Sequence, residues 1–153
     1  MTDMIADHEV RLASRTPLHL WIVGVLSLLW NSIGCVDYTM SRLHNAAYLA
    51  NMPAEQLAYF DSFPAWAIAL WAFGVWGALA GSVLLLLRKR WAVTAFAISL
   101  AGLVLMTVYQ LGLSNAPAMM HTASNYGFTA LLWLIAIALL LYARRQAANG
   151  VLR

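Results

Sequence analysis

The stretch LHLWIVGVLSLLWNSIGCVDYTM, residues 18–40, decides the fold, because it is long and mostly apolar up to Leu29 and then becomes polar. At 1.5 Å of rise per residue, a helix of this length crosses a hydrocarbon core of about 30 Å. Lipid offers the backbone no hydrogen-bond partner, so we expect a membrane-spanning helix. Its second half contains Asn31 and Asp37, and polar groups inside a span are costly and often functional.

The composition is that of an integral membrane protein. The chain has 153 residues, of which 63% are hydrophobic and 10% charged, whereas a soluble domain is about 45–50% apolar and about 25% charged. The net charge of +3 does not indicate nucleic-acid binding, because the basic residues lie at the ends of apolar segments. The single cysteine, Cys35, excludes an intrachain disulfide and a paired-cysteine redox motif.

Four apolar segments predict an all-α, integral membrane four-helix bundle. The fourth segment can begin at residue 117, after a cap at Ser114 or Asn115, or only at residue 126. No internal repeat relates the two halves of the chain. The expected division is a tail at 1–17, spans at 18–40, 64–87, 91–113 and 117/126–143, and a second tail at 144–153.

The basic residues predict the orientation. In a four-span arrangement all Lys and Arg except Arg42 fall on one side of the membrane. An excess of Lys and Arg marks the cytoplasmic side, so both termini and the turn at 88–90 are expected there. On the outer side, the helix-start pattern Asn51-Met52-Pro53-Ala54-Glu55 predicts a short interfacial helix near residues 53–60.

Small residues in the second span predict close helix packing. Contact between helices of the same chain and contact between two chains of a dimer both fit this pattern. The chain can also form a homo-oligomer. The residues expected at this contact are Gly74, Gly77, Ala78 and Gly81.

Polar residues near the outer ends of the spans predict an outward-facing polar mouth that could bind a ligand. For Asn31 the alternative is an interhelical hydrogen bond. For Asp37 it is an interfacial acid that pairs with Arg42 or caps a neighbouring helix, and for the whole set it is a solvated rim. The candidate ligand-binding residues are Asn31, Asp37, Tyr38, Tyr109, Gln110, His121 and Asn125.

The sequence predicts no catalytic residue, no metal site and no cofactor. His44 and His121 have methionines nearby in the sequence, but their spacing matches no known ligand pattern. The only lysine, Lys89, lies in the predicted turn, which excludes a Schiff base inside the bundle. No nucleophile elbow, phosphate loop or carboxylate pair is present.

Three stretches, WNSIGCVDYTM at 30–40, MPAEQLAYFDSFPAWAIALWAFGVWGALAGSVLLLLRKRWAV at 52–93 and YQLGLS at 109–114, carry a resemblance. The chain looks like a family of small proteobacterial four-span inner-membrane proteins, and the similarity runs from Thr16 to Arg153. Members are mostly uncharacterised, and some bear an automatic label of sugar transporter. The chain differs from small sugar transporters built of three-helix half-repeats, because it has four spans and no proline in the first.

Taken together, the residues and the resemblance favour a non-enzymatic protein of the bacterial inner membrane. The first hypothesis is a binder or transporter of a small solute or lipid-like ligand, using the polar mouth. The second is an accessory subunit of a larger respiratory or photosynthetic membrane complex, and the third, of lower weight, is a membrane enzyme. Besides the lipid bilayer, a larger complex or a second copy is the expected partner.

Overall fold

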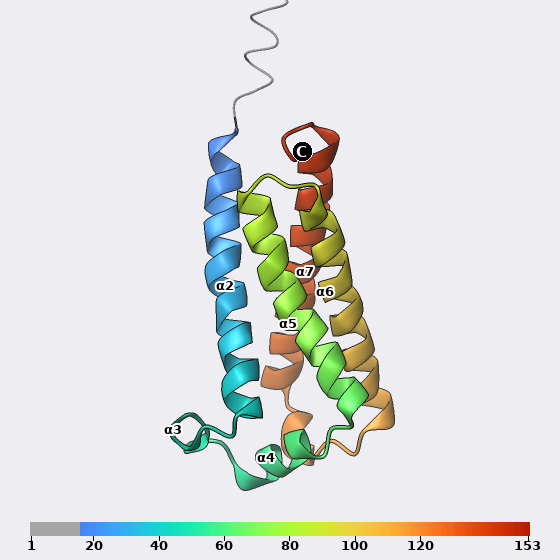
Figure 1. The fold of residues 1–153 in the computed structure, drawn as a ribbon. Coiled ribbons are helices and arrows are strands. Elements are labelled where there is room, and N and C mark those ends of the chain that lie inside the picture. The colour runs from blue at the N-terminus through green and yellow to red at the C-terminus, as the bar shows by residue number, and fades with distance from the viewer. Residues whose placement is uncertain (1–15) are drawn as a thin grey trace, which may run out of the picture.

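The computed structural model describes residues 16–153, and this part of the chain is helical without a β-strand. Four of its helices are long and apolar enough to cross a membrane, as the sequence predicted (Figure 1). The expected tail at 1–17 lies outside the described residues except for its last two. The long helices are α2 (Leu18–Arg42), α5 (Ala65–Leu86), α6 (Trp91–Val108), which continues as the π-helix η1 (Tyr109–Leu113), and α7 (Ala123–Ala148).

Short helices fill the longer connections. Helix α4 (Ala54–Asp61) occupies the position at which the sequence predicted a short helix, and α3 (Ala46–Leu49) precedes it. Helix α7 begins between the two predicted starts, because Thr122 accepts a hydrogen bond from the Asn125 backbone N–H and caps the helix. Residues ahead of this cap form the separate 3₁₀ turn η2 (Ala118–Met120).

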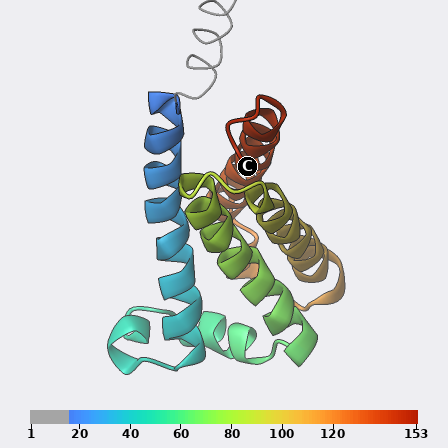
Figure 2. The same cartoon turned by 45° about the horizontal axis from the view of Figure 1, so that its top comes forward.

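Helix α5 crosses between α2 and α6, and α7 packs mainly on α6 (Figures 1 and 2). Glycines allow α5 and α6 to approach closely, as expected for small residues in a membrane. A Cβ placed on Gly77 would lie 3.2 Å from the Ser99 nitrogen, and one on Gly102 would lie 2.8 Å from the Gly74 nitrogen. A Cβ on Gly81 would lie 2.7 Å from the Phe96 ring.

The predicted packing residues therefore divide between two contacts within the chain. Gly74, Gly77 and Gly81 lie against α6, where the Ser99 hydroxyl also donates to the Gly74 carbonyl oxygen at 2.6 Å. Ala78 instead presents its carbonyl oxygen to Asn31 of α2.

Three of the long helices end in a residue with positive φ. These residues are His44 after α2, Arg88 after α5 and Gly150 after α7, with φ of 50°, 55° and 72°. In each case the backbone N–H groups of this residue and of the next one donate to carbonyl oxygens in the last turns of the helix, which is the Schellman pattern. For example, the Lys89 N–H donates to the Leu84 carbonyl oxygen at 2.8 Å. A left-handed conformation costs a non-glycine residue free energy. His44 and Arg88 both make a side-chain hydrogen bond that offsets this cost.

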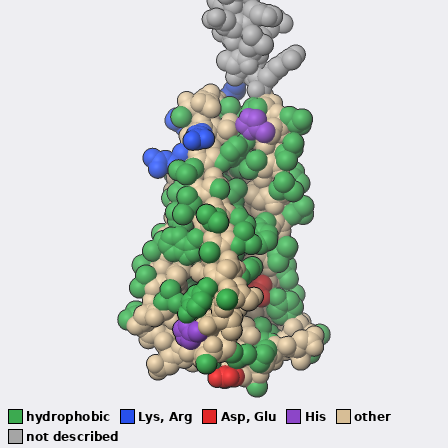
Figure 3. Space-filling model, turned by 180° about the vertical axis from the view of Figure 1, so that it is seen from behind, with side chains coloured by type: hydrophobic (Ala, Val, Ile, Leu, Met, Phe, Trp, Pro, Cys, Tyr) green, Lys and Arg blue, Asp and Glu red, His purple; other side chains and the backbone are tan. Residues whose placement is uncertain are grey.

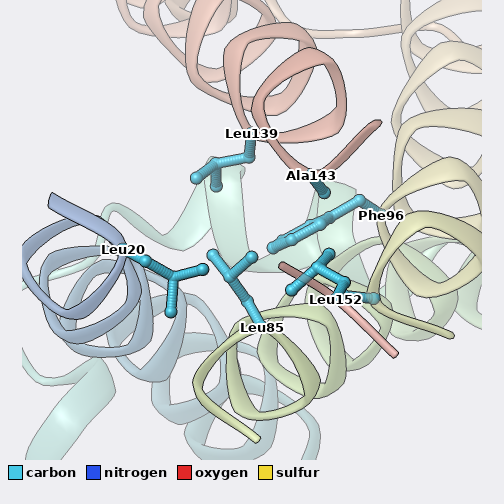
Figure 4. Close-up of a cluster of buried hydrophobic side chains, with 7 residues drawn as sticks. Leu20, Leu85, Phe96, Leu139, Ala143 and Leu152 are labelled. Carbon is cyan, nitrogen blue, oxygen red and sulfur yellow. The ribbon is translucent and has the colours of Figure 1, made fainter. Parts of the chain in front are cut away.

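Two buried clusters hold the ends of the bundle. At the end near the α5–α6 turn, Leu20, Leu85, Phe96 and Leu139 bring all four long helices together around Leu152 (Figure 4). At the opposite end an aromatic cluster joins α4, α5, α6 and η1. Its buried members are Tyr59, Phe63, Ala67, Met106 and Tyr109.

The charges are separated along the bundle. The Arg88 guanidinium donates to the Thr16 hydroxyl at 2.6 Å, which places the start of α2 beside the α5–α6 turn. The Arg153 N–H donates to the Arg88 carbonyl oxygen at 2.7 Å, so the chain also ends there. Figure 3 shows Lys and Arg side chains gathered at this end and Asp and Glu side chains toward the other.

Candidate functional site

Asn31 is a packing residue of the α2–α5 contact. Its side chain is buried, and its amide donates to the Ser82 hydroxyl at 2.9 Å and to the Ala78 carbonyl oxygen at 3.3 Å. The predicted interhelical hydrogen bond is thus confirmed. Because both partners belong to α5, the amide N–H groups point into the helix contact and away from the predicted mouth.

Asp37 pairs with a tyrosine and not with Arg42. The Tyr48 hydroxyl, from α3, donates to Asp37 Oδ1 at 2.7 Å. This bond to the neutral phenol, together with partial burial and the nearby negative charge, raises the pKa of Tyr48. Within residues 16–153 the only contact at ion-pair distance joins His44 to Asp61 at 2.9 Å, and no Lys or Arg of this part of the chain lies at that distance from Asp37.

Tyr38 and Tyr109 belong to a continuous series of aromatic contacts. The Tyr38 ring meets Trp71 edge-on at a centroid distance of 5.0 Å, and Trp71 in turn contacts Phe60 of α4. Tyr109 packs edge-on between Phe63 at 5.4 Å and Trp66 at 4.9 Å. These contacts fasten α4 across the end of the bundle, and no pattern in the sequence predicted that the two tyrosines serve this purpose.

Gln110, His121 and Asn125 make local contacts. The Gln110 carbonyl oxygen accepts from the Ser114 hydroxyl at 3.0 Å, within the π-helical end of α6. His121 shares a hydrogen bond of 2.8 Å with the Tyr126 hydroxyl. The Asn125 amide donates to the Met119 carbonyl oxygen at 3.0 Å, which fastens the 3₁₀ turn to α7.

The seven predicted residues therefore do not converge on one contact network. Within residues 16–153, no hydrogen bond joins Asn31 or Asp37 to any of the other predicted polar residues. These remaining residues are Tyr38, Tyr109, Gln110, His121 and Asn125.

A different feature lies between α2 and α7. Near the α5–α6 turn these helices touch, because His19 and the Tyr142 hydroxyl share a hydrogen bond of 2.5 Å and Leu139 joins the buried cluster. Leu139 is only 8% exposed, whereas Phe128 is 55% exposed. The two lie eleven residues apart, about three helical turns, and so occupy the same face of α7. This face of α7 is therefore covered at Leu139 and exposed toward the start of the helix.

The facing side of α2 is defined by His19, Val23, Trp30 and Asp37, which recur at intervals of four and seven residues. Val23 packs against the buried cluster, while Trp30 and Asp37 are half-buried. We call the two sides of these helices, with Trp30 and Asp37 on α2 and Phe128 on α7, the α2–α7 face. An apolar depression lined by Trp21, Ile22, Val25 and Leu26 lies along α2 itself.

The chain was compared with known families, curated proteins and solved structures. None of them matches it.

The α2–α7 face combines apolar side chains with one carboxylate. Within residues 16–153 no group of three His, Cys, Asp or Glu side chains could hold a metal ion. Asp37 receives one hydrogen bond, at Oδ1, and a carboxylate can accept several. The arrangement can therefore accept a hydrogen bond from, or pair with, the polar head of a molecule whose apolar part lies along the helices.

Proposed function

We propose that this multi-pass membrane protein binds a lipid-like amphiphile on the α2–α7 face, without catalysing a reaction. The apolar part lies against Phe128 and Trp30, and a hydroxyl or amine head group bonds to Asp37. The observation that supports this proposal is the change in exposure along one face of α7, from buried at Leu139 to exposed at Phe128.

The charge of Asp37 supports the choice of head group. A carboxylate at the edge of a membrane is costly unless it is paired or hydrogen-bonded. Tyr48 supplies one hydrogen bond but no positive charge. An amine or hydroxyl would supply the second partner, whereas an anionic head group would be repelled.

Binding of a spin-labelled long-chain amine to the purified protein in neutral detergent tests this assignment. Charge-assisted hydrogen bonds contribute roughly 1.5–3 kcal/mol, so Asp37→Asn is expected to weaken binding about tenfold or more. Asp61→Asn is the control, because it removes the same charge from an exposed aspartate that contacts His44 and does not belong to the α2–α7 face. Equal affinity of the Asp37→Asn variant and the wild type would count against the site.

A second candidate is an accessory subunit of a larger membrane complex. Helix α5 exposes Trp66, Phe73 and Trp76, which recur at intervals of seven and three residues on one face. Such a face suits contact with another membrane protein. Purification in mild detergent should then recover fixed partners, and recovery of this chain alone would exclude the subunit role.

We also propose that the end with Arg88 faces the cytoplasm of a bacterial inner membrane. The gathering of basic residues at this end, with Asp37, Glu55 and Asp61 toward the other, supports this orientation. The resemblance to four-span inner-membrane proteins supports the location. A reporter fused after Arg153 should be active only if it folds in the cytoplasm, and an outer-side signal would reverse the orientation.

A further inference from the structure

Backbone hydrogen bonds assemble four cationic residues at the α5–α6 turn. The Arg153 N–H donates to the Arg88 carbonyl oxygen at 2.7 Å, and the Arg90 N–H donates to the main-chain oxygen of Arg153 at 3.0 Å. This is the bonding pattern of a parallel β-bridge that sets Arg153 opposite Lys89. A residue more than sixty positions away in the sequence thus joins the basic turn.

The position of Arg153 is fixed by its apolar neighbour. Helix α7 ends at Gly150, whose positive φ of 72° reverses the chain. The reversal inserts Leu152, only 2% exposed, between Leu85 and Phe96 (Figure 4). We call residues 150–153 the C-terminal strap. Burial of Leu152 holds the charge of Arg153 at the turn.

Placing these cationic side chains close together costs free energy, because like charges repel, and a bound anion would offset this cost. Within residues 16–153 none of these four residues has an acidic partner at ion-pair distance. Lys89, Arg90 and Arg153 are exposed. The fold thus presents a cationic surface that is built by specific backbone bonds and is open to a ligand.

We propose that this surface binds the phosphate-bearing head group of an anionic phospholipid. Trp91 follows the turn directly and is 70% exposed, as expected for a tryptophan at the boundary between hydrocarbon and head groups. The apolar ends of α5 and α6 lie immediately beside the turn, so a head group reaches the cations while its acyl chains stay in the bilayer. Basic sites at helix ends bind anionic lipids in this way.

Native mass spectrometry of the full chain, titrated with phosphatidylglycerol or phosphatidylcholine, tests the proposal. The wild type should bind phosphatidylglycerol more tightly, and inorganic phosphate at equal concentration should not displace it. One surface cation contributes about fivefold, so a double Lys89→Gln, Arg153→Gln variant should bind about 25-fold more weakly. The control Arg42→Gln removes a charge at the other end and should change nothing.

A second variant distinguishes the effect of the position of the strap from the effect of the net charge. Leu152→Ala keeps every charge but frees the strap, so it should weaken phosphatidylglycerol binding about fivefold and make a further Arg153→Gln change ineffective. Equal binding of the two lipids, displacement by inorganic phosphate, or an equal effect of Arg42→Gln would overturn the proposal. A chain that starts at Thr16 should bind as the wild type does. A tenfold gain would assign the surface to the segment before Thr16, which has three acidic and two basic residues, and would also overturn the proposal.

Discussion

Substitution of Gly102 by alanine tests the close contact on which the bundle depends. The added Cβ would lie 2.8 Å from both the Gly74 nitrogen and the Leu70 carbonyl oxygen. Ordinary contacts between such atoms are about 3.4–4 Å, so the helices would have to separate by roughly 0.6 Å or more. Both obstructing atoms belong to the α5 backbone, and no side-chain rotation can relieve the overlap.

The expected loss follows from two opposing terms. Overpacking of a close contact costs about 1–3 kcal/mol, and replacement of glycine by alanine in a helix returns about 1 kcal/mol. Gly127, inside α7, is the matched control because a Cβ there would meet nothing within 4 Å. Gly127→Ala should therefore stabilise the protein by up to about 1 kcal/mol, and Gly102→Ala should be less stable than this control by about 1–3 kcal/mol.

Reversible unfolding in mixed micelles, with increasing fractions of a denaturing detergent, measures the free energy of unfolding of both variants. The comparison removes the intrinsic preference of alanine for helices and leaves the contact between α5 and α6. If the two variants unfold at the same detergent fraction, the close packing of Gly102 against α5 is wrong.

Three further predictions concern single contacts. Asn31→Ala should lower the free energy of unfolding by about 1–2 kcal/mol, and a double-mutant cycle with Ser82→Ala should give a coupling of about 0.6 kcal/mol; zero coupling would contradict the bond. The hydrogen bond to Asp37 raises the pKa of Tyr48 above 10.0. The bond therefore stabilises the folded protein fully below pH 10, and this stabilisation is lost as the pH rises through the raised pKa. Tyr48→Phe should therefore reduce the loss of thermal stability at alkaline pH, and an unchanged pH profile would contradict this. Cys35 is 5% exposed, so a maleimide should label it only after unfolding, and prompt labelling of the folded protein would refute its burial.

The four spans could be predicted from the sequence because lipid leaves the chain few options. A segment of about twenty apolar residues must satisfy its own backbone hydrogen bonds, and a helix is the simplest structure that does so. The ends of the helices were harder to predict. His44 and Arg88 adopt the left-handed conformation that favours glycine, and the tertiary bonds that compensate them, to Asp61 and Thr16, leave no local signal.

The polar mouth was predicted from depth in the membrane, and depth alone does not determine which residues meet. Asn31 and Asp37 are six residues apart, which turns their side chains about 120° from each other around α2. Asn31 therefore faces α5, whereas Asp37 lies to the side and bonds to Tyr48 of α3. Tyr109 lies at the expected end of the bundle, but it packs into the aromatic cluster. The angular position of each residue depended on the packing of the neighbouring helices, which the sequence did not supply.

The most direct test of the proposed function is mass spectrometry of the molecules that remain bound after purification in mild detergent. The wild type should retain an amphiphile with an amine or hydroxyl head group at close to one molecule per chain. The Asp37→Asn variant should lose it, while Asp61→Asn should keep it. If the wild type carries no such molecule, or if Asp37→Asn retains the same one in the same amount, the α2–α7 face is not its binding site.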